Sequence, residues 1–149
     1  MNLTLTAVTA EEYPALTELW EASVRATHDF LPEAHIQRLR PLILNDYLAA
    51  VELRAARDQQ GTLLGFAGVH GRKLEMLFID PAHRGAGVGK ALLACAIAEL
   101  GVREVDVNEQ NPQATGFYLH QGFVVTGRSE RDGQGEPFPL LHLQIAAPV

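Results

Sequence analysis

The sequence predicts an α/β protein with a mixed central β-sheet of about seven strands flanked by about four helices. Three observations support this class. Apolar segments joined by tight turns in the first half are typical of antiparallel hairpins. A strand, a glycine-rich loop and a helix follow one another at residues 74–93. The remaining third alternates strand and helix patterns, which adds parallel strand pairs to the antiparallel ones.

The first strand and the first two helices are predicted from local patterns. Residues 3–8 alternate apolar and threonine side chains, which indicates a half-buried strand. Thr9 and Glu12 form a capping-box pattern, which begins a helix that we expect to end at about Arg25. A second helix is expected over residues 32–44, with a proline in its first turn. Pro41 lies inside that segment and is a candidate point of interruption.

Three strands joined by short turns are expected next. Residues 51–57 are assigned to a strand by their position, although their alanines also suit a helix. Residues 58–61 have the composition of a hairpin turn, and residues 63–70 form the returning strand. Residues 73–79 form the central strand, whose continuous apolar end is typical of a strand covered on both faces.

The second half of the chain alternates between helix and strand patterns. Its helices are predicted from a run of good helix formers and from an asparagine–proline pair that suits an N-cap and a first helical position. The expected elements are a helix at about 87–100, a strand at 104–107, a helix from Pro112 to about 121, and strands at 123–129 and 139–145.

Length and composition indicate a single cytoplasmic domain over residues 1–149. The 149 residues, 47% hydrophobic and 20% charged, suit one globular domain. No apolar run approaches the roughly 18 residues that cross a bilayer, and residues 1–6 do not resemble a signal peptide. The net charge of −6 argues against a nucleic-acid surface and favours a cationic substrate. Cys95, the one cysteine, excludes an internal disulfide and is expected in the core.

The glycine-rich loop has the features of a phosphate-binding site. Asp80-Pro81 ends the preceding strand, because proline cannot donate a hydrogen bond to a sheet. Glycines at alternate positions over residues 85–89 let the backbone turn and approach a ligand. The following helix offers unpaired amides and the positive end of its dipole, and Arg84 and Lys90 add charge. A phosphate or pyrophosphate site is therefore favoured over a tight turn without a ligand.

The spacing of the loop excludes two common phosphate-binding motifs. The Walker A motif requires glycine where Arg84 stands and serine or threonine where Ala91 stands. The dinucleotide-binding pattern G-x-G-x-x-G requires glycine at Lys90 or at Leu92. A nucleotide-binding domain is therefore disfavoured.

The spacing that does occur matches a known family. The pattern Arg84-x-x-Gly87-x-Gly89 resembles the coenzyme A loop of the GNAT acetyltransferases, and residues 77–81 resemble that family's fourth strand. Two further blocks, at residues 108–118 and 122–123, also resemble the family. The blocks at residues 25–31 and 139–143 narrow the resemblance to the bacterial YjaB-like subgroup.

This resemblance implies a GNAT fold and an acetyl-CoA-dependent N-acetyltransferase. The acetyl group would pass from acetyl-CoA, the co-substrate, to a primary amine by direct attack in a ternary complex, without a metal. The loop amides and their flanking cations would bind the phosphates, and the preceding strand would bind the pantetheine arm and polarise the thioester. The expected coenzyme-binding residues are Leu77, Phe78, Ile79, Arg84, Gly85, Ala86, Gly87, Val88, Gly89, Lys90, Asn111 and Tyr118.

Two side chains are expected to transfer protons. Tyr118 is the expected general acid for the departing thiolate, because a phenol pKa of roughly 10 lies near that of a thiol. The alternative for Tyr118 is a core aromatic residue. Glu75 is the expected general base, acting through water, and an exposed strand residue is the equal alternative. His70 and His28 are the other candidates for the base.

The acceptor is a small-molecule or peptide amine whose identity stays open. By the resemblance, His28 and Phe30 are expected to contact it. The remaining histidines are expected to be surface or core residues without a role in the site: His35, His83, His120 and His142. No spacing suggests a metal site. A non-catalytic acyl-CoA-binding module of the same fold is the alternative function, which Tyr118 argues against. A monomer or homodimer is expected, with neither nucleic acid nor a membrane as partner.

Overall fold

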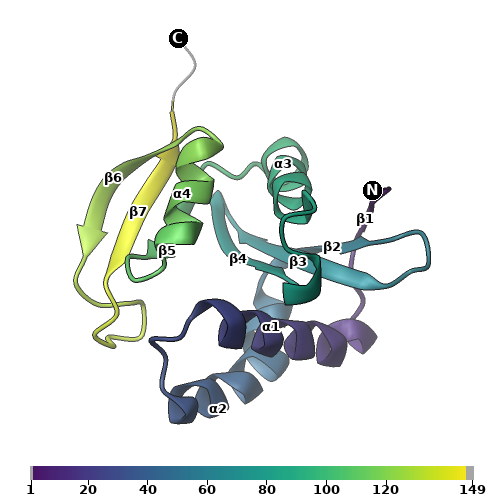
Figure 1. Ribbon diagram of the computed structural model, residues 1–149, viewed down its shortest axis with the longest axis horizontal. Coiled ribbons are helices and arrows are strands. Elements are labelled where there is room, and N and C mark those ends of the chain that lie inside the picture. Colours follow the sequence, from purple (N-terminus) through teal and green to yellow (C-terminus); the bar gives the residue numbers. More distant parts are fainter. Residues whose placement is uncertain (1, 147–149) are drawn as a thin grey trace. The chain divides into compact units, whose positions relative to one another are not determined.

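The computed structural model describes residues 2–146, which form two compact units that meet in the sequence at Val102 and Arg103 (Figure 1). The described residues contain seven strands and four α-helices, which is the number and order that the sequence predicts. No helix among residues 2–146 combines the length and the apolar composition needed to cross a bilayer.

The first unit contains four antiparallel strands in the order β1-β2-β3-β4. Their bounds are Thr4–Thr6 for β1, Glu52–Arg57 for β2, Leu63–His70 for β3 and Lys73–Ile79 for β4. The turn after β2 forms because Asp58 Oδ1 accepts the amides of Gln60 and Thr62, both at 2.9 Å, and Gly61 adopts a φ of +80°. The predicted hairpins are therefore confirmed.

Helices cover the two opposite faces of this sheet (Figure 1). Helices α1 (Tyr13–Thr27) and α2 (Glu33–Leu42) pack on one face, and α3 (Val88–Leu100) packs on the other. The core under α1 and α2 consists of apolar side chains that include Leu16, Trp20, Val24, Ile36, Leu53, Phe66 and Met76. On the other face Gly65 lets α3 approach closely, since a Cβ there would lie 3.2 Å from Val88 Cγ1.

The first helices differ from the prediction at two places. The Thr9 amide donates to Glu12 Oε1 at 3.2 Å as expected, but Ala10–Glu12 form a 3-10 turn and α1 begins at Tyr13. Pro41 does not interrupt α2, which continues to Leu42 and into a π-helical turn at Ile43–Tyr47. A proline removes one helical hydrogen bond and crowds the preceding turn, and a wider turn accommodates that disruption.

The second unit contains three antiparallel strands in the order β5-β7-β6 and helix α4 (Figure 1). The bounds are Glu104–Asn108 for β5, Pro112–His120 for α4, Phe123–Ser129 for β6 and Leu140–Ile145 for β7. Helix α4 packs against β5 and β6, and the core of this unit consists of Val105, Val107, Tyr118, Phe123 and Leu143. Gly122, with a φ of +99°, ends the helix as predicted.

Candidate functional site

Strand β4, which leads into the glycine loop, contains a β-bulge at Glu75. Gly68 of β3 pairs with Met76, and the next residue, Val69, pairs with Leu74, so Glu75 is the extra residue on β4. Its side chain is exposed. Bulges are frequent beside active sites because they change the direction of a side chain. The sequence did not predict this bulge, although the family resemblance pointed to Glu75 as the base.

The apolar end of β4 is less covered than predicted. Met76 is 7% exposed, whereas Leu77, Phe78 and Ile79 are only half-buried. Phe78 packs against Phe66 with ring centroids 5.7 Å apart, on the face that α1 and α2 cover. Helices therefore lie on both faces of β4, as predicted, but their cover over these three residues is incomplete. Part of their surface stays accessible to a ligand.

The glycine loop has the backbone conformation that the sequence predicts. Asp80 Oδ1 accepts the Ala82 amide at 2.9 Å and shapes a short 3-10 turn at Pro81–His83. Gly85 and Gly87 have φ values of +82° and +85°, in the left-handed region that favours glycine. Apart from the adjoining residues of the chain, no atom of the described residues lies within 4 Å of the position that a Cβ would take on either glycine. The loop therefore borders open space.

Helix α3 begins directly after this loop. Val88 is 1% exposed and anchors the first turn of the helix in the core. Arg84 and Ala86 in the loop and Lys90 in the helix are exposed. The first helical hydrogen bond joins the Ala91 amide to the Gly87 carbonyl at 3.0 Å, so the amides from Val88 to Lys90 precede it. These amides and the positive end of the helix dipole suit an anion. The predicted residues from Arg84 to Lys90 thus lie together.

In the second unit, Asn111 and Tyr118 lie near opposite ends of α4. Asn111 Oδ1 accepts the Ala114 amide at 3.1 Å, which confirms the predicted N-cap. Tyr118 is 7% exposed, and its ring contacts the edges of Phe117 and Phe123 with centroids 5.1 and 5.6 Å away. Burial raises the pKa of Tyr118 well above its ordinary value. The phenol therefore keeps its proton at neutral pH.

His28 and Phe30 lie together in the connection between α1 and α2, with ring centroids 5.3 Å apart. The Thr27 hydroxyl donates to the Ser23 carbonyl at 2.8 Å and lies 2.7 Å from His28 Nδ1. Because a hydroxyl has one proton, His28 Nδ1 must be the donor in the second contact, which leaves the lone pair on Nε2. Burial lowers the pKa of His28, and Asp29 opposes this weakly. Burial thus favours the neutral imidazole of His28, with its lone pair on Nε2.

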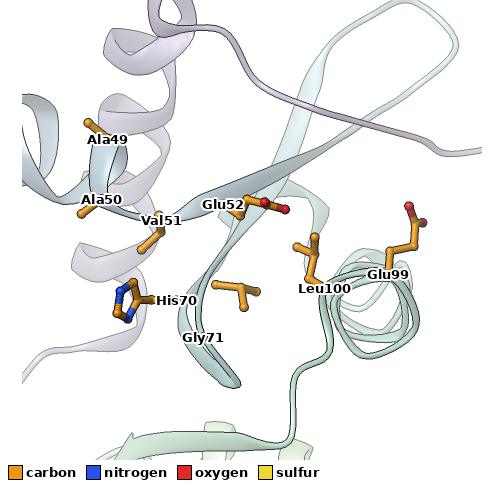
Figure 2. A pocket seen from close by; sticks show the side chains of 9 residues that line it. Ala49, Ala50, Val51, Glu52, His70, Gly71, Glu99 and Leu100 are labelled. Carbon is orange, nitrogen blue, oxygen red and sulfur yellow. The ribbon is translucent and has the colours of Figure 1, made fainter.

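A hollow of about 490 Å³ lies at the other end of α3 (Figure 2). Figure 2 shows His70 and Gly71 at the end of β3 on one side of it, and Glu99 and Leu100 at the end of α3 on the other. A helix of 13 residues is about 20 Å long, so this hollow and the glycine loop are separate places. His70, one candidate for the base, lines the hollow and not the loop.

The surroundings of Cys95 and His142 can be compared with the expectations for these residues. Cys95 is buried, and burial raises the pKa of its thiol to about 11, so it is the predicted core residue. His142 is half-buried on β7 and has two side-chain contacts. Its Nδ1 lies 2.7 Å from Asp106 Oδ1 and its Nε2 lies 2.6 Å from Ser129 Oγ. No group of His, Cys, Asp and Glu side chains among residues 2–146 has an arrangement that would hold a metal ion.

Comparisons with known proteins agree with these features. A family model described as acetyltransferase (GNAT) domain matches residues 32–139. Peptidyl-lysine N-acetyltransferase YjaB from Salmonella typhimurium strain LT2 is 45% identical over 89% of this chain and 91% of its own. The protein of the same name from Escherichia coli K12 is 43% identical over 89% and 90%.

The same likeness extends to three dimensions. The solution structure of apo-form YjaB from Escherichia coli has a TM-score of 0.89 and 39% identity, and the match covers 99% of this chain and 100% of the other. The predicted mixed α/β fold is confirmed by this match.

Proposed function

The chain belongs to the GNAT acetyltransferase family, and on this premise we propose that its acceptor is a lysine side chain of a peptide or protein. As a member of that family it is an acetyltransferase that uses acetyl-CoA. Two similar proteins are named peptidyl-lysine N-acetyltransferases, which supports a lysine acceptor and does not favour a non-catalytic binding module. The net charge of −6 also suits a cationic acceptor.

The observation that carries the use of acetyl-CoA in this proposal is the loop before α3. Its two left-handed glycines border open space, and exposed Arg84 and Lys90 stand beside amides at a helix N-terminus. We assign the pyrophosphate of acetyl-CoA to the amides from Gly85 to Gly89, with the two cations neutralising its charge. Three buried or half-buried anchors keep this loop in place: Ile79, Asp80 and Val88.

The thioester end of the coenzyme is assigned to β4. Backbone groups of Leu77 and Ile79 would pair with the pantetheine arm as an added strand, and an amide near Phe78 would polarise the thioester carbonyl. The half-buried surface of these residues supports the assignment, because an apolar arm can cover it. Removal of one such preorganised hydrogen-bond donor typically lowers kcat by about 10²–10³-fold.

The reaction requires two protons to leave the lysine ammonium and one to reach the coenzyme thiolate. A base takes the ammonium proton, and the neutral amine attacks the thioester carbonyl carbon to form a tetrahedral intermediate. The C–S bond then breaks, the amide nitrogen gives up its second proton to solvent, and Tyr118 gives its phenolic proton to the thiolate before solvent restores it. The retained proton of buried Tyr118 supports the acid role, although its raised pKa makes it a weaker acid than an exposed tyrosine.

Two residues compete for the role of base. Glu75 is exposed on a bulge, which suits transfer through a water molecule. His28 is neutral, has its lone pair on Nε2, and lies beside Phe30, the other residue assigned to the acceptor. We keep Glu75 as the proposed base and His28 as the alternative.

A panel of acceptors tests the choice of substrate. We expect a peptide with a blocked N-terminus and one internal lysine to have a kcat/KM at least about tenfold above that of a lysine-free peptide with a free N-terminus. Free thiol is measured with acetyl-CoA present, and the control contains no acceptor. A higher kcat/KM for the free N-terminus, or for a polyamine, would contradict a lysine acceptor.

We also propose that the chain acts in the cytoplasm as a single domain over residues 1–149, as a monomer or homodimer. Its ordinary globular composition and single cysteine support this proposal. Light scattering after size-exclusion chromatography measures the oligomeric state directly.

A further inference from the structure

Three side chains in the second unit form a hydrogen-bonded chain that the acetyl transfer proposed above does not use. Asp106 Oδ1 lies 2.7 Å from His142 Nδ1, and His142 Nε2 lies 2.6 Å from Ser129 Oγ. The imidazole thus connects a carboxylate to a hydroxyl through its two different nitrogens. The residues come from the three neighbouring strands β5, β7 and β6.

The strand register explains how these residues meet. Asp106 of β5 pairs directly with His142 of β7, so the two side chains emerge next to each other on one face. On the other side of β7, His142 pairs with Gly127 of β6. A Cβ on Gly127 would lie 3.5 Å from His142 Cδ2, so the imidazole ring packs over Gly127. Ser129, two residues along β6, is therefore within reach of Nε2.

This face of the three strands is distinct from the one that α4 covers. Val105 and Val107 point into the core, so Asp106 between them points to the opposite face. The exposed fraction of the side chain is 35% for His142 and 20% for Asp106, and Ser129 is half-buried. A small molecule can therefore reach the hydroxyl and the imidazole.

The contacts also define where the protons lie when His142 is a neutral imidazole. The Asp106 carboxylate is an acceptor only, so His142 Nδ1 carries the proton and Nε2 carries the lone pair. Ser129 Oγ must then donate its proton to Nε2. A nucleophile, a base and a group that orients the base stand in the order that serine hydrolases use on unrelated folds.

We propose that Ser129 is a nucleophile that accepts acyl groups from small carboxylic esters and that this site hydrolyses them. Ser129 Oγ attacks the ester carbonyl carbon while its proton passes to His142 Nε2. The C–O bond to the leaving group breaks, the leaving group takes that proton, and Ser129 holds the acyl group as an ester. Water then attacks with His142 as base, which releases the carboxylic acid and restores the Ser129 hydroxyl. Asp106 holds the imidazole in the required tautomer throughout.

The substrate class follows from the surroundings of the hydroxyl. Ser129 lies on a half-exposed strand face, where a small ester with a good leaving group has access. p-Nitrophenyl acetate is therefore the probe for hydrolysis, and a small fluorophosphonate is the probe for the nucleophile, because it forms a stable bond with an activated serine. Neither probe needs the coenzyme loop.

The test compares the unchanged protein with Ser129→Ala, His142→Gln and Asp106→Asn. General-base assistance contributes about 10²–10⁴-fold, so we expect each variant to lose at least about tenfold in ester hydrolysis and in the rate of fluorophosphonate labelling. Peptide mapping should find the label on Ser129. Thr126→Ala is the matched control: Thr126 lies on the same strand, but its hydroxyl donates to the His142 backbone carbonyl and not to the ring.

Two further measurements separate this site from the acetyltransferase. Gly87→Val should lose coenzyme A binding and keep ester hydrolysis. Ser129→Ala should lose ester hydrolysis and keep coenzyme A binding. Melting temperatures show whether each variant is folded, and the nearly isosteric Asp106→Asn serves if Ser129→Ala does not fold. The proposal is overturned if labelling of the folded protein does not exceed that of the heat-denatured protein. It is also overturned if Ser129→Ala or Asp106→Asn reacts at the rate of the unchanged protein.

Discussion

Gly87 provides the sharpest test of the coenzyme loop, because its conformation and its surroundings are both known. Its φ of +85° lies in the left-handed region, and the space that a Cβ would enter is open. In Gly87→Val the added Cβ meets no atom beyond the adjoining residues, and the side chain would enter the space assigned to the pyrophosphate. We therefore expect a loss of coenzyme A affinity that exceeds anything the loss of stability explains.

The magnitude of each effect can be estimated separately. An L-residue in the left-handed region costs about 1–2 kcal/mol, and this corresponds to a fall in Tm of roughly 2–8 °C for a chain of this size. Loss of one charge-assisted hydrogen bond to phosphate costs about 1.5–3 kcal/mol, which is an increase in Kd of about 10- to 100-fold. The two effects are measured by thermal unfolding without ligand and by titration calorimetry with coenzyme A.

Gly61→Val is the matched control for this experiment. Gly61 has a φ of +80° in the hairpin turn after β2, and a Cβ there would also meet no atom within 4 Å. The two variants should therefore lose a similar amount of stability, and only Gly87→Val should lose coenzyme A affinity. Equal coenzyme A affinities for the two folded variants would refute the assignment of the loop.

Three further predictions concern proton transfer and surface charge. Tyr118→Phe should lower kcat by about 10²–10⁴ while the Tm changes little, because the ring contacts remain; a kcat within threefold of the unchanged protein would refute the acid role. If Glu75 is the base, Glu75→Gln should remove the fall of kcat/KM at low pH, and His28→Gln should keep it. The reverse result would assign the base to His28. In that case the fall should occur below pH 6.5, because burial lowers the pKa of His28. Hydrogen bonds from Arg25 lower the pKa of Glu33 from 4.5 to about 2, so this pair stabilises the fold above about pH 4.5 and the contribution is lost as the pH falls towards 2. The Tm difference between the unchanged protein and Glu33→Gln should therefore decrease as the pH falls over this range, and it should also decrease in high salt. A Tm difference that does not depend on pH would contradict this prediction.

Local sequence signals predicted the elements whose ends are set by turn chemistry. The bounds of β3 and β4 agree with the prediction residue for residue, because Gly61 and Gly71, both with positive φ, fix the turns around β3. The N-cap at Asn111 agrees for the same reason, since its side chain bonds to an amide only three residues away. Each of these features depends on neighbours in the chain.

Features that depend on strand register could not be predicted from the sequence. The bulge at Glu75 exists because Gly68 pairs with Met76 while Val69 pairs with Leu74, and no local pattern specifies that shift. Asp106 and His142 are 36 positions apart and meet only through the pairing of β5 with β7. The conformation of the glycine loop was therefore predicted well from the sequence, whereas the bulge and the contact between Asp106 and His142 were not.

The central claim, acetyl transfer from acetyl-CoA to a peptide lysine, is tested most directly by following a labelled acetyl group. The protein is mixed with acetyl-CoA that carries an isotopic label in its acetyl group and with a peptide that has a blocked N-terminus and one lysine. Mass spectrometry of the peptide and a free-thiol assay are read together over time. We predict that the label appears on the lysine Nε in equal molar amount to the coenzyme A released. Release of coenzyme A without label on the lysine would contradict the proposed function.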